Sequence, residues 1–113
     1  MIEPRLASGV FISAIKRLIE AEGDFATVLK KGDAISGAIL LIGQVRGADP
    51  VIYERYPSLD GTSGWQHVDL SDRNDVIVQN YWKKRGVQDP DLWVLELDVA
   101  SAARLDGLLA ALN

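Results

Sequence analysis

The chain contains a single histidine, His67, and imidazole is the side chain best suited to proton transfer near neutral pH. Asp69 follows two residues later and Glu54 precedes it, and a carboxylate beside a histidine can orient it as a general base. The nearest hydroxyls, Thr62 and Ser63, fall in a polar loop, which supplies no positioned nucleophile. A small hydrolase that uses His67 with a nearby carboxylate is therefore an alternative. The pattern favours an ordinary structural histidine.

Two pairs of carboxylates stand in the C-terminal part of the chain. Asp89 and Asp91 flank Pro90 and could bind Mg²⁺ or Ca²⁺, but the calcium-loop pattern is missing and these residues are common in turns. Glu96 and Asp98 share one side of an expected strand, and such a pair performs acid–base chemistry when it lies in a cleft. On a solvated strand the same pair only adds solubility. We predict no catalytic residue, no metal site and no cofactor.

A second alternative is nucleic-acid binding through the basic cluster Lys83, Lys84 and Arg85, which follows Tyr81 and Trp82. Cations beside aromatic rings can neutralise phosphates and stack on bases. At the end of a helix, however, the macrodipole alone explains such charges. The net charge of −4 and the isoelectric point near 4.8 disfavour binding to nucleic acid.

Aromatic residues gather on either side of the longest polar loop, residues 57–64. Tyrosine, tryptophan and arginine are the residues enriched in binding hot spots. The same residues can instead cap the core at a sheet edge. We predict a binding surface made of Tyr53, Arg55, Tyr56, Trp65 and His67. The hypothesis that follows is a noncatalytic module that binds a protein or a small-molecule ligand, rather than an enzyme.

Length and composition predict one globular domain over residues 1–113. A content of 48% hydrophobic and 25% charged residues is typical of folded proteins. The absence of cysteine excludes disulfides and thiolate metal sites, and it fits a reducing compartment. No apolar run reaches the roughly 18 residues that a membrane span needs. The N-terminus makes a poor secretory signal, so we expect a cytoplasmic protein that does not contact membranes.

Hydrophobic periodicity predicts eight elements. They are a helix over 10–22, strands over 25–30, 37–45, 51–56 and 65–70, a helix over 72–85, a strand over 92–99 and a helix over 100–112. The uninterrupted apolar run over 38–42 suits a central strand covered on both faces. Glu54 and Arg55 suggest that the third strand lies at an edge or has a wet face. Ser71 and Gly86 are the expected caps of the second helix.

The expected fold class is α+β, with a mainly antiparallel sheet of about five strands and helices packed on it, in the order α-β-β-β-β-α-β-α. Short turns predict that the first strands form an antiparallel meander, and the long connection through the second helix permits a parallel pair at the end. In the last strand Trp93, Leu95, Leu97 and Val99 alternate with Val94, Glu96 and Asp98. One face of that strand should be buried and the other at least partly wet.

Three segments carry a resemblance to a known family: SGVFISAIKRL over 8–18, KKGDAISGAILL over 30–41 and DPDLWVLELD over 89–98. With these segments the chain resembles a family of small alphaproteobacterial proteins that consist of a conserved domain of unknown function. The resemblance implies a soluble, stand-alone bacterial domain, and it supplies no catalytic residues. A homodimer through a strand edge or the last helix is also allowed.

Overall fold

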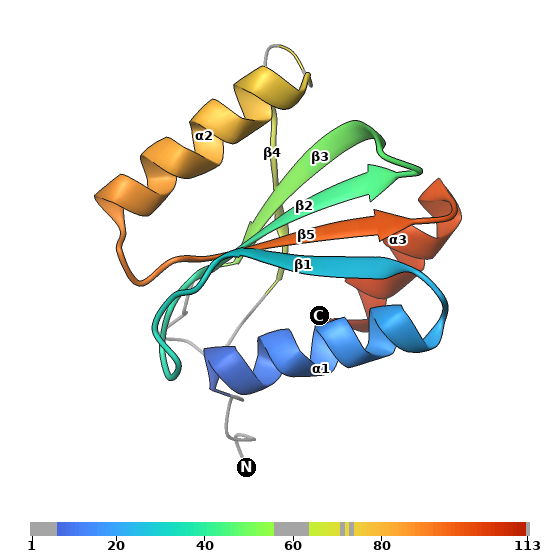
Figure 1. The fold of residues 1–113 in the computed structure, drawn as a ribbon, viewed down its shortest axis with the longest axis horizontal. Helices are drawn as coiled ribbons and strands as arrows, with labels where there is room; N and C mark the ends of the chain where they lie inside the picture. The colour runs from blue at the N-terminus through green and yellow to red at the C-terminus, as the bar shows by residue number, and fades with distance from the viewer. Residues whose placement is uncertain (1–6, 56–63, 71, 73, 113) are drawn as a thin grey trace.

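The eight elements follow one another in the predicted order in a computed structural model, which describes residues 7–55, 64–70, 72 and 74–112. The elements are α1 (Ser8–Ala21), β1 (Phe25–Lys30), β2 (Ile39–Val45), β3 (Ala48–Arg55), β4 (Gln66–Val68), α2 (Asp75–Gln88), β5 (Trp93–Val99) and α3 (Ala102–Ala111). The strands form one mostly antiparallel sheet, and the helices pack on it (Figure 1). The predicted α+β fold is therefore confirmed.

The strand order in the sheet is β1-β5-β2-β3-β4, so the last strand of the sequence lies inside the sheet. β5 pairs antiparallel with β1 and parallel with β2. The predicted meander holds for β2, β3 and β4 but is wrong for β1, because β5 separates β1 from β2. The parallel partner of β5 is β2 rather than β4. The side chains of Val94 and Leu95 are both fully buried, and such a strand needs a neighbour on each side and a cover on each face.

The two faces of the sheet are covered by different helices. α1 and α3 lie on one face and α2 crosses the other (Figure 1). The core on the α1 and α3 face contains Phe11, Ile12, Ile15, Ile19, Ala26, Ile39, Leu41, Trp93, Leu95, Leu97, Val99, Leu105, Leu108 and Leu109. The core on the α2 face contains Ala38, Leu40, Ile42, Ile52, Val78, Leu92 and Val94. The predicted alternation of β5 is confirmed, since its four odd-numbered residues belong to the first set and Val94 to the second.

The close packing of α3 depends on a glycine in β2. A Cβ atom on Gly43 would lie 2.7 Å from the Leu105 side chain, so the missing side chain lets α3 approach the sheet. At the opposite end of the sheet, the Trp93 indole donates a hydrogen bond of 2.6 Å to the Asp33 carbonyl. This bond ties the entrance of β5 to the segment between β1 and β2.

The third strand corrects one prediction. β3 lies between β2 and β4, and Glu54 is only 4% exposed, so it is on neither an edge nor a wet face. The Glu54 carboxylate is buried because it accepts hydrogen bonds from the Tyr81 hydroxyl at 3.1 Å and from Arg85 Nε at 3.0 Å. Charges are found inside proteins when they are paired in this way.

The second helix differs from its prediction at its end. α2 continues through Gly86 to Gln88, so Gly86 is not its cap. At its start, Asn74 is the N-cap, and its side chain accepts a hydrogen bond from the Ile77 amide at 3.0 Å. Ser71, the predicted cap, lies outside the described residues. In the described part of the chain no helix has the length and apolar character needed to cross a membrane.

Candidate functional site

The predicted aromatic residues come together on the face of the sheet that carries α1. Tyr53 on β3 stands opposite His67 on β4, and their ring centroids lie 5.5 Å apart. The Arg55 guanidinium carbon lies 4.3 Å from the ring centroid of Phe11, within the range of a cation–π contact. We call Tyr53, Arg55, Trp65 and His67 the aromatic surface. Tyr56, the remaining predicted binding residue, lies outside the described residues.

The other half of the aromatic surface closes the core. The Trp65 ring is half-buried and its centroid lies 6.2 Å from that of Phe11. The same Arg55 guanidinium lies 5.8 Å from the Trp65 ring. Trp65 therefore caps the hydrophobic core, as one of the two interpretations of the sequence expects, while His67 is exposed.

The structure separates His67 from one of its proposed carboxylate partners. Successive residues of a strand point to opposite faces, and Tyr53 faces α1, so Glu54 faces α2. Glu54 is therefore not the partner of His67. Asp69 is exposed, two residues along the chain. The hydroxyl residues Thr62 and Ser63 lie outside the described residues.

The basic cluster at the end of α2 does not act as a unit. Lys83 and Lys84 are exposed, whereas the Arg85 side chain is 19% exposed and forms an ion pair with Glu54 at 3.0 Å. Arg85 therefore fastens α2 to β3. The aspartates that follow the helix form a turn, in which the Asp89 carboxylate accepts a hydrogen bond from the Asp91 amide at 3.2 Å. Among the described residues no three acidic or histidine side chains form a group that could hold a metal ion.

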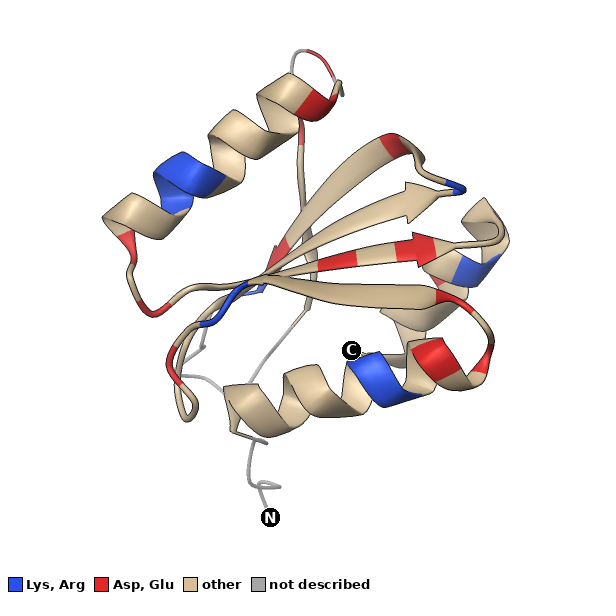
Figure 2. Cartoon of the chain, viewed as in Figure 1, with Lys and Arg blue, Asp and Glu red and all other residues tan. Residues whose placement is uncertain are grey.

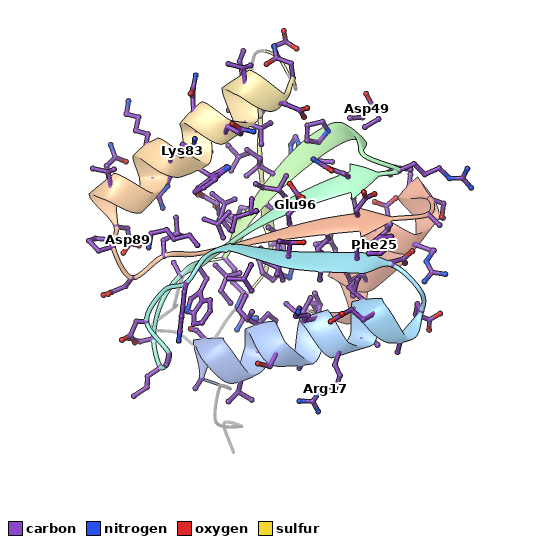
Figure 3. The ribbon with its side chains drawn as sticks, viewed as in Figure 1. Arg17, Phe25, Asp49, Lys83, Asp89 and Glu96 are labelled. Atoms are coloured by element: carbon purple, nitrogen blue, oxygen red, sulfur yellow. The ribbon has the colours of Figure 1, made fainter. Side chains whose placement is uncertain are left out.

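A cleft of about 330 Å³ lies between α2 and the sheet, and we call it the α2 cleft. β1, β2, β5 and the turn after β2 form its floor, and α2 forms its wall. Its lining residues are Leu29, Ile42, Gln44, Gly47, Asp75, Val78, Gln79, Trp82 and Glu96. Figure 3 shows Glu96 on β5, in the middle of the sheet. The volume is at the lower end of the range for small-molecule sites.

The α2 cleft is acidic. Burial raises the pKa of Glu96, and the nearby charges of Asp98 and Asp75 raise it further. The Glu96 carboxylate has no hydrogen-bond or ion-pair partner among the residues that the structure describes, whereas the Asp98 carboxylate accepts a hydrogen bond from the Gly47 amide at 3.0 Å. Figure 2 shows the acidic residues on β5 and at the start of α2. A raised pKa in a cleft is a recognised mark of a functional site.

The cleft exists because α2 buries little apolar surface, since Val76 and Val87 are exposed. Val78 is its only buried residue in the described part of the chain, while Tyr81 and Trp82 are half-buried against the same core. A helix without a wide apolar stripe cannot lie flat on a sheet. β5 contributes the polar floor, because its alternation places Glu96 and Asp98 on the α2 face. The sequence pointed to this acidic pair, but it gave no sign that Gln44 and Gln79 would join it.

A second cavity, of about 310 Å³, lies between α1 and α3. Leu18, Ile19 and Leu108 give it apolar walls. At its rim the Arg104 guanidinium pairs with Asp24 at 2.7 Å and with Glu22 at 3.5 Å. The charged groups of this cavity therefore satisfy one another, unlike the Glu96 carboxylate in the α2 cleft.

Comparison with known proteins places the chain among proteins without an assigned activity. A family model described as a protein of unknown function, DUF1491, matches residues 6–106. The crystal structure of a DUF1491 family protein from Caulobacter crescentus CB15 is 28% identical, with a TM-score of 0.76 over 86% of this chain and 91% of that chain. The NMR structure of a DUF1491 family protein from the same organism is 28% identical, with a TM-score of 0.73 over 84% and 86%.

A third solved structure, the solution structure of a protein from A. tumefaciens, is 26% identical, with a TM-score of 0.74 over 94% of this chain and 93% of that chain. No curated protein matches the chain. Both organisms are alphaproteobacteria, so the resemblance drawn from the three sequence segments is confirmed.

Proposed function

Because the chain belongs to the DUF1491 family, whose members are proteins of unknown function, we propose a function from its own geometry: it is a noncatalytic module that binds a small ligand in the α2 cleft. The observation that carries this proposal is the unpartnered, half-buried Glu96 carboxylate in a cleft built from three strands, a turn and a helix. A concave site with a few convergent polar groups and a perturbed pKa is the default position for a ligand.

The lining of the cleft supports the binding of a small ligand. Its polar side chains are the amides of Gln44 and Gln79, the indole of Trp82 and two carboxylates. None of these lining residues is a serine, threonine, cysteine, lysine or histidine, so the carboxylates of Asp75 and Glu96 are the only lining side chains that could act as a nucleophile or a base. Its apolar side chains, Leu29, Ile42 and Val78, instead offer a surface for the body of a ligand.

Blocking the cleft tests this proposal. The full chain is titrated with butylammonium, butan-1-ol, butyrate and glucose, and amide and indole resonances are followed by NMR. We expect at least one compound to shift the resonances of Gln44, Gly47, Gln79 and Glu96. Gln79→Trp should abolish these shifts because the larger ring fills the cleft. Asn80→Trp, at the next exposed position of α2, is the matched control and should keep them.

Two results would refute the proposal. One is a panel in which no compound shifts the cleft resonances of the wild-type chain. The other is a set of shifts that survives in Gln79→Trp as fully as in Asn80→Trp.

The aromatic surface supports a second candidate function, contact with a protein partner. The supporting observation is the exposed His67 ring, which contacts the Tyr53 ring at an interplanar angle of 57°, together with the Arg55 guanidinium over Phe11. We expect His67→Ala to release a partner that the wild-type chain retains in a pull-down, while Ser13→Ala on exposed α1 retains it. The same partner yield with both variants would count against this surface. His67 is the better test position because Trp65 also packs against the core.

A further inference from the structure

The charges around the α2 cleft have one sign. Glu96 and Asp75 line it, and Asp98 lies close enough to raise the pKa of Glu96. None of the lining residues is an arginine or lysine. Arg46, which precedes Gly47 in the turn, donates a hydrogen bond to the Ala100 carbonyl at 3.3 Å. A ligand that enters this cleft therefore meets negative potential.

The cleft also has an aromatic wall and an apolar floor. The Trp82 ring lines it, and the ring attracts Lys83 Nζ, which lies 5.8 Å from its centroid. Lys83 is exposed and lies outside the lining. Leu29, Ile42 and Val78 add apolar surface to the lining. A bare metal ion would leave this apolar surface without a contact. A cation on a hydrocarbon stem matches both the carboxylates and the apolar side chains of the cleft.

We infer that the ligand of the α2 cleft is a small organic cation, a primary ammonium on a short apolar stem, with its charged end at Glu96 and its stem against Leu29, Ile42 and Trp82. This inference rests on the proposed function of the cleft. The ammonium offsets the repulsion among Glu96, Asp98 and Asp75, and it gives Glu96 the partner that the described residues do not supply. A hydrogen bond to a charged group is worth more than one between neutral groups.

Three compounds of equal length and different charge test the ligand class: butylammonium, butan-1-ol and butyrate. We expect butylammonium to bind about tenfold more tightly than either analogue, because one charge-assisted bond is worth about 1.5 kcal/mol. Glu96→Gln should weaken butylammonium binding by about tenfold, because it removes the charge and keeps the shape. Glu20→Gln removes a charge from exposed α1 on the other face and should leave the affinity unchanged. Affinity should fall as the pH is lowered and Glu96 becomes protonated.

The outcomes separate this inference from the function on which it rests. If butan-1-ol, butyrate or glucose shifts the cleft resonances as strongly as butylammonium, the cationic class is wrong and the cleft remains a binding site. The same holds if Glu96→Gln binds butylammonium as tightly as Glu20→Gln does. If no compound shifts the cleft resonances, both the inference and the proposed function are wrong.

Discussion

The two faces of the sheet are held to their helices by different forces. On the α1 and α3 face, two helices contribute seven core residues, and their charged groups pair at the rim through Arg104. On the α2 face, one helix contributes the single buried residue Val78 and a polar network of Tyr81 and Arg85 around Glu54. The first face is a close-packed core, and the second is a partial core with a cleft beside it.

This difference matters for function because a ligand site needs a helix that stays close to the sheet without filling the space between them with its own side chains. The apolar stripes of α1 and α3 lie directly on the strands and leave the charged groups outside. α2 is fastened by directional bonds to β3, and the space between it and β5 stays open. Hydrogen bonds fix the distance and orientation of two groups, whereas apolar side chains are most stable when they pack without voids.

The sharpest way to break this comparison is to remove an apolar side chain from each face. Leu97→Ala on the α1 and α3 face should lower the free energy of unfolding by about 3 kcal/mol, because Leu97 is fully buried and leaves a cavity. Val78→Ala on α2 should cost about 1 to 2 kcal/mol, because fewer methyl groups are lost. Urea unfolding measures both values. A loss for Val78→Ala as large as that for Leu97→Ala, although fewer atoms are removed, would show that the α2 face is packed at least as closely as the other face.

The polar fastening of α2 is tested at Arg85. Arg85→Met leaves the buried Glu54 carboxylate without the guanidinium, and it should cost about 2 to 3 kcal/mol, since breaking a buried ion pair is costly. Lys84→Met, at the exposed neighbouring position, should change stability by less than about 0.5 kcal/mol. Chemical denaturation of both variants measures the contrast. Similar stability of the two variants would mean that the Arg85–Glu54 pair does not hold α2.

The Tyr81 hydroxyl should make a smaller contribution to the same network. Tyr81→Phe keeps the ring against the core and removes one hydrogen bond to Glu54, for an expected loss of about 1 kcal/mol. If Tyr81→Phe has the same free energy of unfolding as the wild type, the Tyr81 hydroxyl does not stabilise the Glu54 carboxylate.

The apolar pattern predicted the fold because it depends on period alone. The alternation over 93–99 fixed which residues of β5 enter each core, and the unbroken run over 38–42 fixed an interior strand. The neighbours of β5 in the sheet were not predictable from turn lengths, because they depend on which strands are buried on both faces and therefore lie inside the sheet. Leu40 and Val94 are both fully buried and stand opposite each other in the parallel pair of β2 and β5, a contact that only the three-dimensional structure reveals.

The candidate site was only partly predictable for the same reason. The aromatic residues Tyr53 and His67 meet because β3 and β4 pair and bring them opposite each other, which the consecutive order of the two strands already suggests. The charges of Glu54 and Arg55 predict an edge strand or a wet face, because the sequence does not show that Glu54 has a partner in Arg85, 31 residues away. The α2 cleft joins Gln44, Gln79 and Glu96 from three elements, and no local pattern links them.

The smallest expected effect sharpens the comparison through pH. Because the pKa of Glu96 is raised above its ordinary value of 4.5, the folded state holds this proton more tightly than the unfolded state does. Its contribution to stability is therefore fully present below pH 4.5 and is lost as the pH rises through the folded-state pKa. Glu96→Gln should accordingly gain stability relative to wild type between pH 4 and pH 7, whereas Glu20→Gln should show no such trend. Unfolding free energies at the two pH values measure the gain.

Part of this gain in stability should vanish in added salt, because salt screens the repulsion by Asp98 and Asp75 but does not change the burial of Glu96. A stability difference between Glu96→Gln and wild type that stays constant with pH would mean that the folded protein does not raise the pKa of Glu96.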